Sequence, residues 1–367
     1  MSPRNVILMT RTLGHGGTER QLTGIALSLN RDLFIPHVVC VEASGFRAEE
    51  LHRGGVPILE LPLTSMTNPH CFSCAIKLRR YIRRHRIDLM HTFDTASNLF
   101  GAIATRSLGG LVVLSSQRCH EDTIWPPYRR PTRLAHFLAD GVVVNCEAMK
   151  KHLIDDYSVR GRKIHVCYNG LDTSVFYPAP ASRPAPLCNA THVIGSVCVL
   201  RPEKGLTTLL EAFSMVKGPH PGLRLVIVGS GPELGALEDL SRNLGIVDEC
   251  LFYPSVNDVV PWLRMIDTFV LPSLSEAFSN SIMEAMACGC CTIASRVGGS
   301  PELIEDGQNG MLFEAGSATS LADKLRLAIG NPELRRALSQ RGQTSIGERF
   351  GMLNSARRME EIYSGFL

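Results

Sequence analysis

The chain has 367 residues, 38 Lys and Arg against 35 Asp and Glu, and a mean hydropathy of +0.06. This length favours two domains over a single hydrophobic core, and the composition is that of a globular protein. The apolar run at residues 6–9 is too short for a signal peptide, and no run approaches the roughly 18 apolar residues of a spanning helix, so we expect a cytoplasmic protein.

Charge is distributed unevenly along the sequence. Residues 1–180 carry 22 Lys and Arg against 15 Asp and Glu, whereas residues 181–367 carry 16 against 20. Six of the basic residues lie at 77–86 (KLRRYIRRHR), an expected helix with Leu78, Tyr81 and Ile82 as its apolar stripe. Such a helix either presents a solvated face or contacts an anionic membrane surface, and both interpretations stay open. We expect no nucleic-acid partner, because no aromatic-interleaved basic module is present.

The twelve cysteines show no metal-binding pattern. Cys71-x-x-Cys74 is a lone match to the spacing of metal and redox sites. We therefore interpret the cysteines as reduced, buried thiols, and we expect neither a zinc site nor a redox site.

The first half of the chain alternates short apolar strands with helices. We expect strands at 5–9, 36–41, 58–61, 89–92, 111–115, 141–145 and 164–168, and helices that include 18–29, 74–86 and 98–108. This alternation predicts an α/β fold with a parallel sheet covered on both faces. Residues 123–133 contain three prolines, which predict an irregular loop rather than a helix.

A glycine pair lies near the start of this half, and a proline-rich segment lies at its end. Gly16 and Gly17 follow the first strand and let a ligand approach the backbone closely. Four prolines at 178–186 predict a linker, and we expect a domain boundary between residues 180 and 181.

The second half restarts the alternation with strands expected at 192–200, 223–228, 251–253, 269–272 and 311–313. Arg201 and Lys204 directly follow the first of these strands and precede a helix. Two cations at that position suit a diphosphate, since Arg contacts two oxygens at once and Lys supplies a point charge. The alternative is a structural salt-bridge pair.

Residues 271–299 contain two glutamates eight positions apart, Glu276 and Glu284. A helix is expected to begin near Asn280, so that Glu276 precedes it and Glu284 lies one turn inside it. The free N–H groups of its first turn suit an anion such as a phosphate. The alternative is an ordinary helix with solvated glutamates.

These glutamates, with Phe278, the sequence Glu284-Ala285-Met286-Ala287 and Gly298-Gly299, resemble the two-glutamate motif of the retaining glycosyltransferases of family 4. The resemblance implies the GT-B architecture, with two Rossmann-like domains whose parallel sheets face across a cleft. It implies an acceptor-binding domain at 1–180, a nucleotide-sugar-binding domain at 181–345, and a last helix within 346–367 that crosses back onto the first domain.

The same resemblance assigns roles to residues. It implies that Glu276 contacts hydroxyls of the donor sugar, that Glu284 binds the ribose, and that Arg201 and Lys204 stabilise the leaving diphosphate; these make Glu276, Arg201 and Lys204 the catalytic candidates. The donor-binding candidates are Gly16, Gly17, Arg201, Lys204, Val256, Phe278, Ser279, Asn280, Ser281 and Glu284. The acceptor-side candidates follow strands of the first domain: His91, Asp94, Arg118 and His120.

The function implied is transfer of a sugar, with retention, from a UDP- or GDP-linked donor to a glycan or lipid-linked acceptor in exopolysaccharide or cell-surface glycan biosynthesis. No metal or other cofactor is expected, since two fixed cations take the metal's place. Two alternatives stay open: an epimerase or phosphorylase of the same architecture, and a non-catalytic sugar-nucleotide binding protein. The basic helix adds peripheral attachment to the inner face of a membrane as a further expectation.

Overall fold

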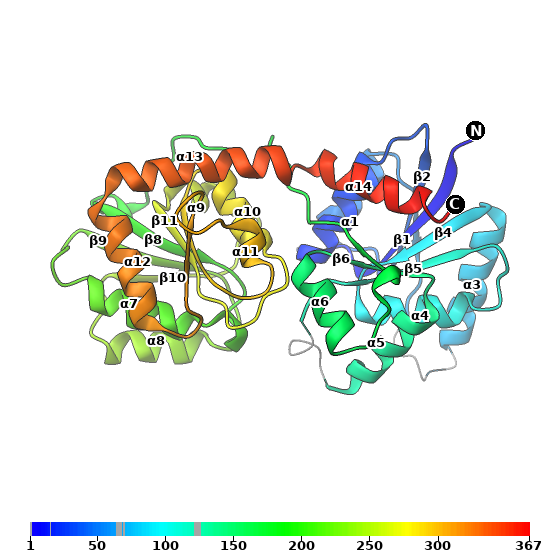
Figure 1. The fold of residues 1–367 in the computed structure, drawn as a ribbon, viewed down its shortest axis with the longest axis horizontal. Helices are drawn as coiled ribbons and strands as arrows, with labels where there is room; N and C mark the ends of the chain where they lie inside the picture. Colours follow the sequence, from blue (N-terminus) through cyan, green and yellow to red (C-terminus); the bar gives the residue numbers. More distant parts are fainter. Residues whose placement is uncertain (1, 15, 64–67, 69, 121–125) are drawn as a thin grey trace. The chain divides into compact units, whose positions relative to one another are not determined.

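The computed structural model describes residues 2–14, 16–63, 68, 70–120 and 126–367, and it divides into two compact units (Figure 1). Unit 1 comprises Met1–Gly170 and Met352–Leu367, and unit 2 comprises Leu171–Gly351. Each unit is built on a parallel β-sheet with helices on its faces. The α/β fold with two Rossmann-like domains is therefore confirmed.

Unit 1 contains a seven-stranded sheet in the order β3-β2-β1-β4-β5-β6-β7. The strands are β1 (Arg4–Thr12), β2 (Phe34–Glu42), β3 (Ile58–Glu60), β4 (Ile87–Thr92), β5 (Val112–Gln117), β6 (Gly141–Val144) and β7 (Ile164–Val166). The helices are α1 (Gly17–Ser28), α2 (Phe46–Arg53), α3 (His70–Arg84), α4 (Thr95–Thr105), α5 (Pro126–Leu138), α6 (Glu147–Asp155) and α14 (Met352–Ser364).

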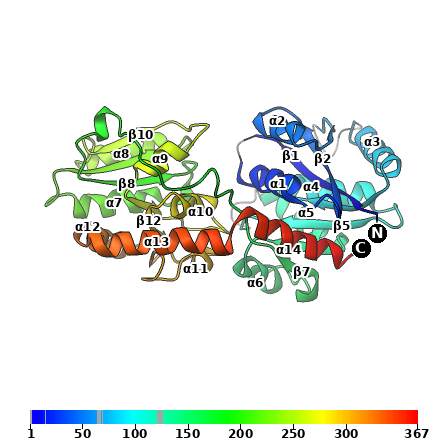
Figure 2. The same ribbon diagram turned by 90° about the horizontal axis from the view of Figure 1, so that it is seen from above.

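Alternate residues of β1 face two different hydrophobic clusters. Val6 and Leu8 pack with α1, α2 and α14, whereas Ile7 and Met9 pack with α3 and α4. A strand covered on both faces needs apolar residues at every position, which explains the unbroken apolar run at 6–9. The last helix α14 thus belongs to the core of unit 1, where it lies against α1 (Figure 2).

Helix α5 contradicts the irregular loop expected at 123–133. The described part of that segment, from Pro126 onward, is helical, and Pro131 lies inside the helix. Pro126 and Pro127 occupy the first turn, where a missing N–H costs nothing, so only Pro131 removes an intrahelical hydrogen bond. Packing of Ala135 and His136, both 0% exposed, compensates for that loss. Residues 123–125 lie outside the described residues.

Unit 2 contains a six-stranded sheet in the order β10-β9-β8-β11-β12-β13. The strands are β8 (His192–Val197), β9 (Leu223–Val228), β10 (Cys250–Tyr253), β11 (Thr268–Leu271), β12 (Cys291–Ser295) and β13 (Met311–Phe313). The helices are α7 (Leu206–Val216), α8 (Leu234–Asn243), α9 (Val260–Met265), α10 (Asn280–Ala287), α11 (Ser300–Leu303), α12 (Ala318–Gly330) and α13 (Pro332–Arg349).

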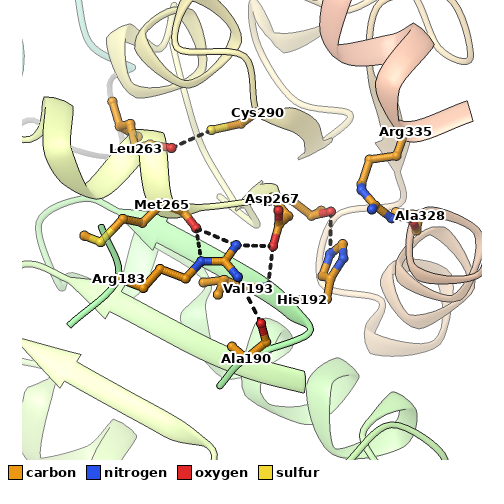
Figure 3. A network of polar contacts seen from close by, with 11 residues as sticks. Arg183, Ala190, His192, Val193, Leu263, Met265, Asp267, Cys290, Ala328 and Arg335 are labelled. Carbon is orange, nitrogen blue, oxygen red and sulfur yellow. Dashed lines mark hydrogen bonds and ion pairs between the residues drawn. The ribbon is translucent and has the colours of Figure 1, made fainter. Parts of the chain in front are cut away.

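The proline-rich segment at 178–186 belongs to unit 2, so the chain leaves unit 1 at Gly170, ten residues before the boundary expected from the prolines. Arg183 fixes the segment: its guanidinium donates to Asp267 Oδ2 at 2.7 Å and to the carbonyl oxygens of Ala190 and Met265 (Figure 3). The same Asp267 oxygen accepts from the N–H of Val193 in β8 at 2.7 Å. These bonds hold the segment to the amino ends of β8 and β11.

Each sheet reverses its strand order once. In unit 2 the reversal lies between β8 and β11, and in unit 1 it lies between β1 and β4. Loops that leave neighbouring strands in opposite directions open a crevice at the carboxyl ends of the strands, and ligands of open α/β sheets bind there. No helix of the described chain is long and apolar enough to cross a membrane.

Candidate functional site

The loops that follow β8 and β11 meet at the strand-order reversal of unit 2. Lys204, in the short 3₁₀ turn after β8, lies with Nζ 2.6 Å from Oε2 of Glu276, in the turn after β11. Ser273 Oγ donates to the same Glu276 oxygen at 3.2 Å. Sequence reasoning did not select Ser273, although its position two residues beyond an apolar strand is a signal for it.

Backbone contacts that only glycine allows join the loops after β8, β11 and β12. Gly205 has φ +61°, and a Cβ there would lie 2.3 Å from the carbonyl oxygen of Pro272. Gly298 has φ +49°, and a Cβ there would lie 1.7 Å from the carbonyl oxygen of Glu276. Leu274 N–H also donates to the Glu203 carbonyl at 2.8 Å. The position of the Glu276 carboxylate is therefore set by the backbone behind it.

The two cations of this loop differ in environment. Burial disfavours the charge on Lys204, but the charge and hydrogen bond of Glu276 outweigh that effect, so the pKa of Lys204 lies above its ordinary value. Arg201 is 59% exposed and lies 3.9 Å from Glu203, an ion pair too exposed to hold it firmly. Lys204 is thus a fixed charge, and Arg201 is available to a ligand.

Helix α10 begins beside this pair. Ser279 is its N-cap and accepts from the N–H of Ile282 at 3.3 Å, and Asn280 and Ser281 form the first turn, as the sequence predicts. Glu284 lies one turn inside α10 and is only 5% exposed, which excludes the solvated surface glutamate considered from the sequence.

The remaining unit 2 candidates lie in the core and in a neighbouring loop. Phe278 is buried with its ring centroid 5.5 Å from that of Phe350, which is a packing contact. Val256 is half-buried in the loop after β10, where Ser255 N–H donates to Ser230 Oγ at 3.0 Å. That bond ties the loop to the one after β9.

In unit 1 the strand-order reversal brings Gly16, Gly17 and Asp94 to the ends of β1 and β4. Gly16 is the N-cap of α1, and a Cβ there would lie 2.0 Å from Glu19 Oε2. Glu19 Oε1 accepts from Thr12 Oγ1 at 2.8 Å. Asp94 is the N-cap of α4 and accepts from the N–H groups of Ser97 and Arg11.

The two histidine candidates, His91 and His120, lie in different environments. His91 is 0% exposed, with Nδ1 2.9 Å from Tyr363 Oη and Nε2 2.7 Å from Ser116 Oγ, and burial, aided by the charge of Arg118, lowers its pKa well below the ordinary value. This is the environment of a hydrogen-bonded core histidine. His120 is half-buried and stacks on His152 with ring centroids 4.2 Å apart.

Arg118 directly follows β5 and donates through Nη2 to Asn169 Oδ1 at 2.7 Å. Its guanidinium carbon lies 5.3 Å from the Phe93 ring centroid. Among the residues that the structure describes, no group of three or more His, Cys, Asp or Glu side chains is arranged to hold a metal ion.

Two family models match the chain. The model described as "Glycosyltransferase Family 4" matches residues 15–175, and the one described as "Glycosyl transferases group 1" matches residues 184–345. The chain is therefore a glycosyltransferase that belongs to family 4. The resemblance found in the sequence is confirmed.

Individual relatives are distant. The N-acetyl-alpha-D-glucosaminyl L-malate synthase of Bacillus anthracis is 26% identical over 303 residues, which cover 80% of this chain and 79% of that protein. The lipopolysaccharide core biosynthesis glycosyltransferase LpsE of Rhizobium meliloti is 29% identical and covers 59% of this chain and 63% of its own. The structure of Anabaena HepE in complex with UDP-glucose superposes with a TM-score of 0.84 at 21% identity, over 98% of this chain and 99% of that one, and this likeness establishes the shared GT-B fold.

Proposed function

We propose that this glycosyltransferase transfers a sugar, with retention of anomeric configuration, from a nucleoside-diphosphate sugar bound at the carboxyl edge of unit 2. The observation that carries the proposal is the Lys204–Glu276 pair at 2.6 Å beside the N-terminus of α10. A cation, a carboxylate and a helix N-terminus are the groups that a sugar diphosphate needs: two for its phosphates and one for its hydroxyls.

The chemistry follows from where charge develops. As the bond from the anomeric carbon to the diphosphate breaks, negative charge grows on the phosphate oxygens, and Arg201, Lys204 and the first-turn N–H groups of α10 stabilise it. Glu276 holds the donor sugar, and the buried Glu284 binds the ribose. A donor phosphate oxygen takes the acceptor proton on the same face, and the two cations make a divalent metal unnecessary.

Substitution of Glu276 tests this assignment. Glu276→Gln should lower the rate of sugar transfer by at least about 100-fold, because the variant loses a hydrogen-bonding charge in the transition state. Lys204→Gln should do the same, and it should also lower the melting temperature because Glu276 loses its charged partner. The measurement is release of the nucleoside diphosphate from UDP- and GDP-sugars, with and without a chelator.

Lys217→Gln is the matched control, since Lys217 pairs with Glu249 at 3.1 Å in the same unit, with exposure similar to that of Lys204. Its activity should match that of the wild type. Equal activity of Glu276→Gln and Lys217→Gln would refute the placement of the donor site, and activity lost to the chelator would refute metal independence.

The two other functions considered from the sequence differ in their products. An epimerase would convert a sugar nucleotide to its isomer without an acceptor, and a phosphorylase would need inorganic phosphate to form a sugar phosphate. A binding protein would bind the nucleotide without turnover. The family membership and the presence of Arg201, Lys204, Glu276 and Glu284 together favour transfer.

We propose a glycan or lipid-linked acceptor in cell-surface glycan or exopolysaccharide biosynthesis. Support comes from the R. meliloti relative, which is named for lipopolysaccharide core biosynthesis. The B. anthracis relative is named for a small acceptor, L-malate, so a panel of acceptors must include both sizes.

The outer face of α3 supports peripheral attachment to an anionic membrane. Leu78 and Ile82 are buried against the sheet, so the apolar stripe is not available to lipid. Phe72, 72% exposed, and the exposed Arg80, Arg83 and Arg84 form the surface that a membrane would contact. Arg79 is excluded, because it donates to the Ala104 carbonyl at 2.5 Å.

Flotation with vesicles tests this attachment. The chain should float with vesicles of phosphatidylglycerol and phosphatidylcholine at low salt, less so at high salt, and neutralising Arg80, Arg83 and Arg84 to Gln should abolish binding. Neutralising the exposed Arg242, Arg326 and Arg336 of unit 2 should have no effect. Equal flotation of both triple variants would exclude α3 as the contact.

A further inference from the structure

Four neighbouring strands of unit 1 end in polar or aromatic residues at one edge of the sheet. Phe93 follows β4, Arg118 follows β5, Asn145 follows β6, and Asn169 lies three residues beyond β7. These strands are adjacent in the order β4-β5-β6-β7 and all run parallel. Their carboxyl ends therefore share the edge at which open α/β sheets bind ligands.

Arg118 lies in the middle of this edge, and not all of its hydrogen-bond donors have a partner. Nη2 donates to Asn169 Oδ1 and the guanidinium carbon lies over the Phe93 ring, but Nη1 is buried and has no hydrogen-bond partner among the described residues. A buried donor on a charged group that lacks a partner is rare, because burial removes the water that would bind it.

No carboxylate among the described residues is found to act on the charge of Arg118. The ionisable side chains that act on it are Cys167, Tyr363 and Cys146, and burial raises the pKa values of Cys167 and Tyr363, so both stay neutral. Burial also lowers the pKa of Arg118 to about 10, which leaves it charged at pH 7. The carboxylate of Asp94, which follows β4, is occupied by Arg11 N–H, Ser97 N–H and Ser97 Oγ.

A second unsatisfied group lies at the same edge. Asn145 is 2% exposed, and its Oδ1 has no hydrogen-bond partner among the residues described. A cationic donor on one strand end and a neutral acceptor on the next suit an anionic group that carries a hydroxyl beside it.

We propose that Arg118 binds an anionic group, a phosphate or a carboxylate, of the acceptor substrate. The inference rests on the proposed function in that unit 1 is taken as the acceptor-binding unit. The donor diphosphate has its own cations, Arg201 and Lys204, in unit 2, so a further unpaired cation in unit 1 implies a further anion. The acceptor class is then anionic rather than a neutral sugar.

The test uses inorganic phosphate and L-malate as probes, with glycerol as the neutral control and NaCl at matched ionic strength. Both anions are titrated against the melting temperature of the Lys204→Gln variant of the whole 367-residue chain, so that binding to the cations of unit 2 is weakened. One or both should raise the melting temperature, and Arg118→Gln in this background should need at least about tenfold more anion for the same shift. A response to phosphate alone or to malate alone identifies the anionic group.

Two control variants test whether the anion response depends on Arg118. Arg133→Gln removes another arginine of unit 1 that lies over an aromatic ring, that of Tyr157, and it should leave the response unchanged. Arg118→Lys keeps the charge and should retain part of the response even where Arg118→Gln folds poorly. An equal response of Arg118→Gln and Arg133→Gln, or no anion response beyond that to NaCl, overturns the proposal.

A separate titration with UDP, GDP and ADP distinguishes the two proposals. Nucleotide affinity of the Arg118→Gln chain with Lys204 intact should equal that of the wild type, and a tenfold loss would assign Arg118 to the donor and overturn the inference. Failure of the wild type to bind any nucleotide would refute the donor site, whereas the anion response of Arg118 would be unaffected.

Discussion

Gly298 is the residue whose substitution most directly tests how the backbone positions Glu276. A Cβ at Gly298 would overlap the Glu276 carbonyl oxygen, so Gly298→Ala must displace the turn that carries the carboxylate, in addition to the strain of a positive φ. If Glu276 acts as proposed, activity should fall by at least about 100-fold, because small displacements of a group that contacts the reacting sugar are costly. The measurement is the steady-state rate of nucleoside-diphosphate release.

Gly307→Ala is the matched control for Gly298→Ala. Gly307 also has a positive φ, +77°, but a Cβ there would have no neighbour within 4 Å. It should lose about 1 kcal/mol of folding free energy through strain and retain activity. Equal activity of the two variants would show that the close approach of Gly298 to the Glu276 carbonyl does not affect activity.

Among single residues, the sequence indicated Lys204, Glu276 and Glu284, because each lies in a recognisable pattern beside a strand or helix end. It did not indicate that Ser273 donates to Glu276 or that His91 is held by Ser116 and Tyr363. Ser273 and Glu276 lie in one turn, but their bond depends on how that turn folds. The contacts of His91 join three elements, β4, β5 and α14, so no local pattern encodes them.

Helix α5 gives a pH prediction at the scale of one element. His136 is 0% exposed, with Nδ1 2.9 Å from Ser115 Oγ and Nε2 3.1 Å from Gln117 Oε1, and burial lowers its pKa from 6.5 to about 4. The unfolded chain therefore binds a proton at His136 below pH 6.5, whereas the folded chain does so only near pH 4. The stabilisation is complete above pH 6.5 and is lost as the pH falls toward 4, by up to about 3 kcal/mol.

Urea unfolding at pH 7, 6, 5 and 4.5 measures this loss. His136→Gln, which keeps a side chain able to hydrogen-bond, should be less stable at pH 7 but should lose less stability on acidification than the wild type. Parallel curves for the two proteins would contradict the assignment. His192 in unit 2, with a pKa lowered to about 4 mainly by burial, contributes in the same direction to both proteins and cancels in the comparison.

Most elements were predictable from the sequence, because buried parallel strands read as apolar runs separated by helices. The strands expected at 223–228 and 311–313 coincide with β9 and β13. Helix α5 was not predictable, because its three prolines argue against a helix when only the local sequence is considered. Packing against α4, together with the hydrogen bonds from His136 to Ser115 and Gln117 of β5, stabilises the helix.

The chain crosses between its units twice, and the second crossing gives a prediction for the whole molecule. Met359, Ile362 and Tyr363 of α14 are at most 4% exposed and belong to the core of unit 1, although they are joined in sequence to unit 2. Removing residues 352–367 should therefore destabilise unit 1 by several kcal/mol and leave unit 2 folded. Hydrogen exchange read by peptide should show faster exchange in β1, β2 and β4 but unchanged protection in β8, β9 and β11.

Met359→Ala offers a milder form of the same experiment, with an expected loss of about 2–5 kcal/mol in unit 1. Leu353→Ala is the matched control, since Leu353 lies on the same helix and is 62% exposed. Faster exchange in unit 2 after either change would contradict the division of the chain into these units.

The sequence by itself determined the fold class, the family and the positions of the two cations and two glutamates, because apolar periodicity and short motifs are local properties of a chain. Only the tertiary structure decided that Lys204 pairs with Glu276, 72 residues away, and that Arg118 lies among neutral groups with Nη1 unpaired within the described residues. Both depend on which strands become neighbours. Strand order is a property of the whole sheet, so it sets which loops meet and which charges remain without a partner.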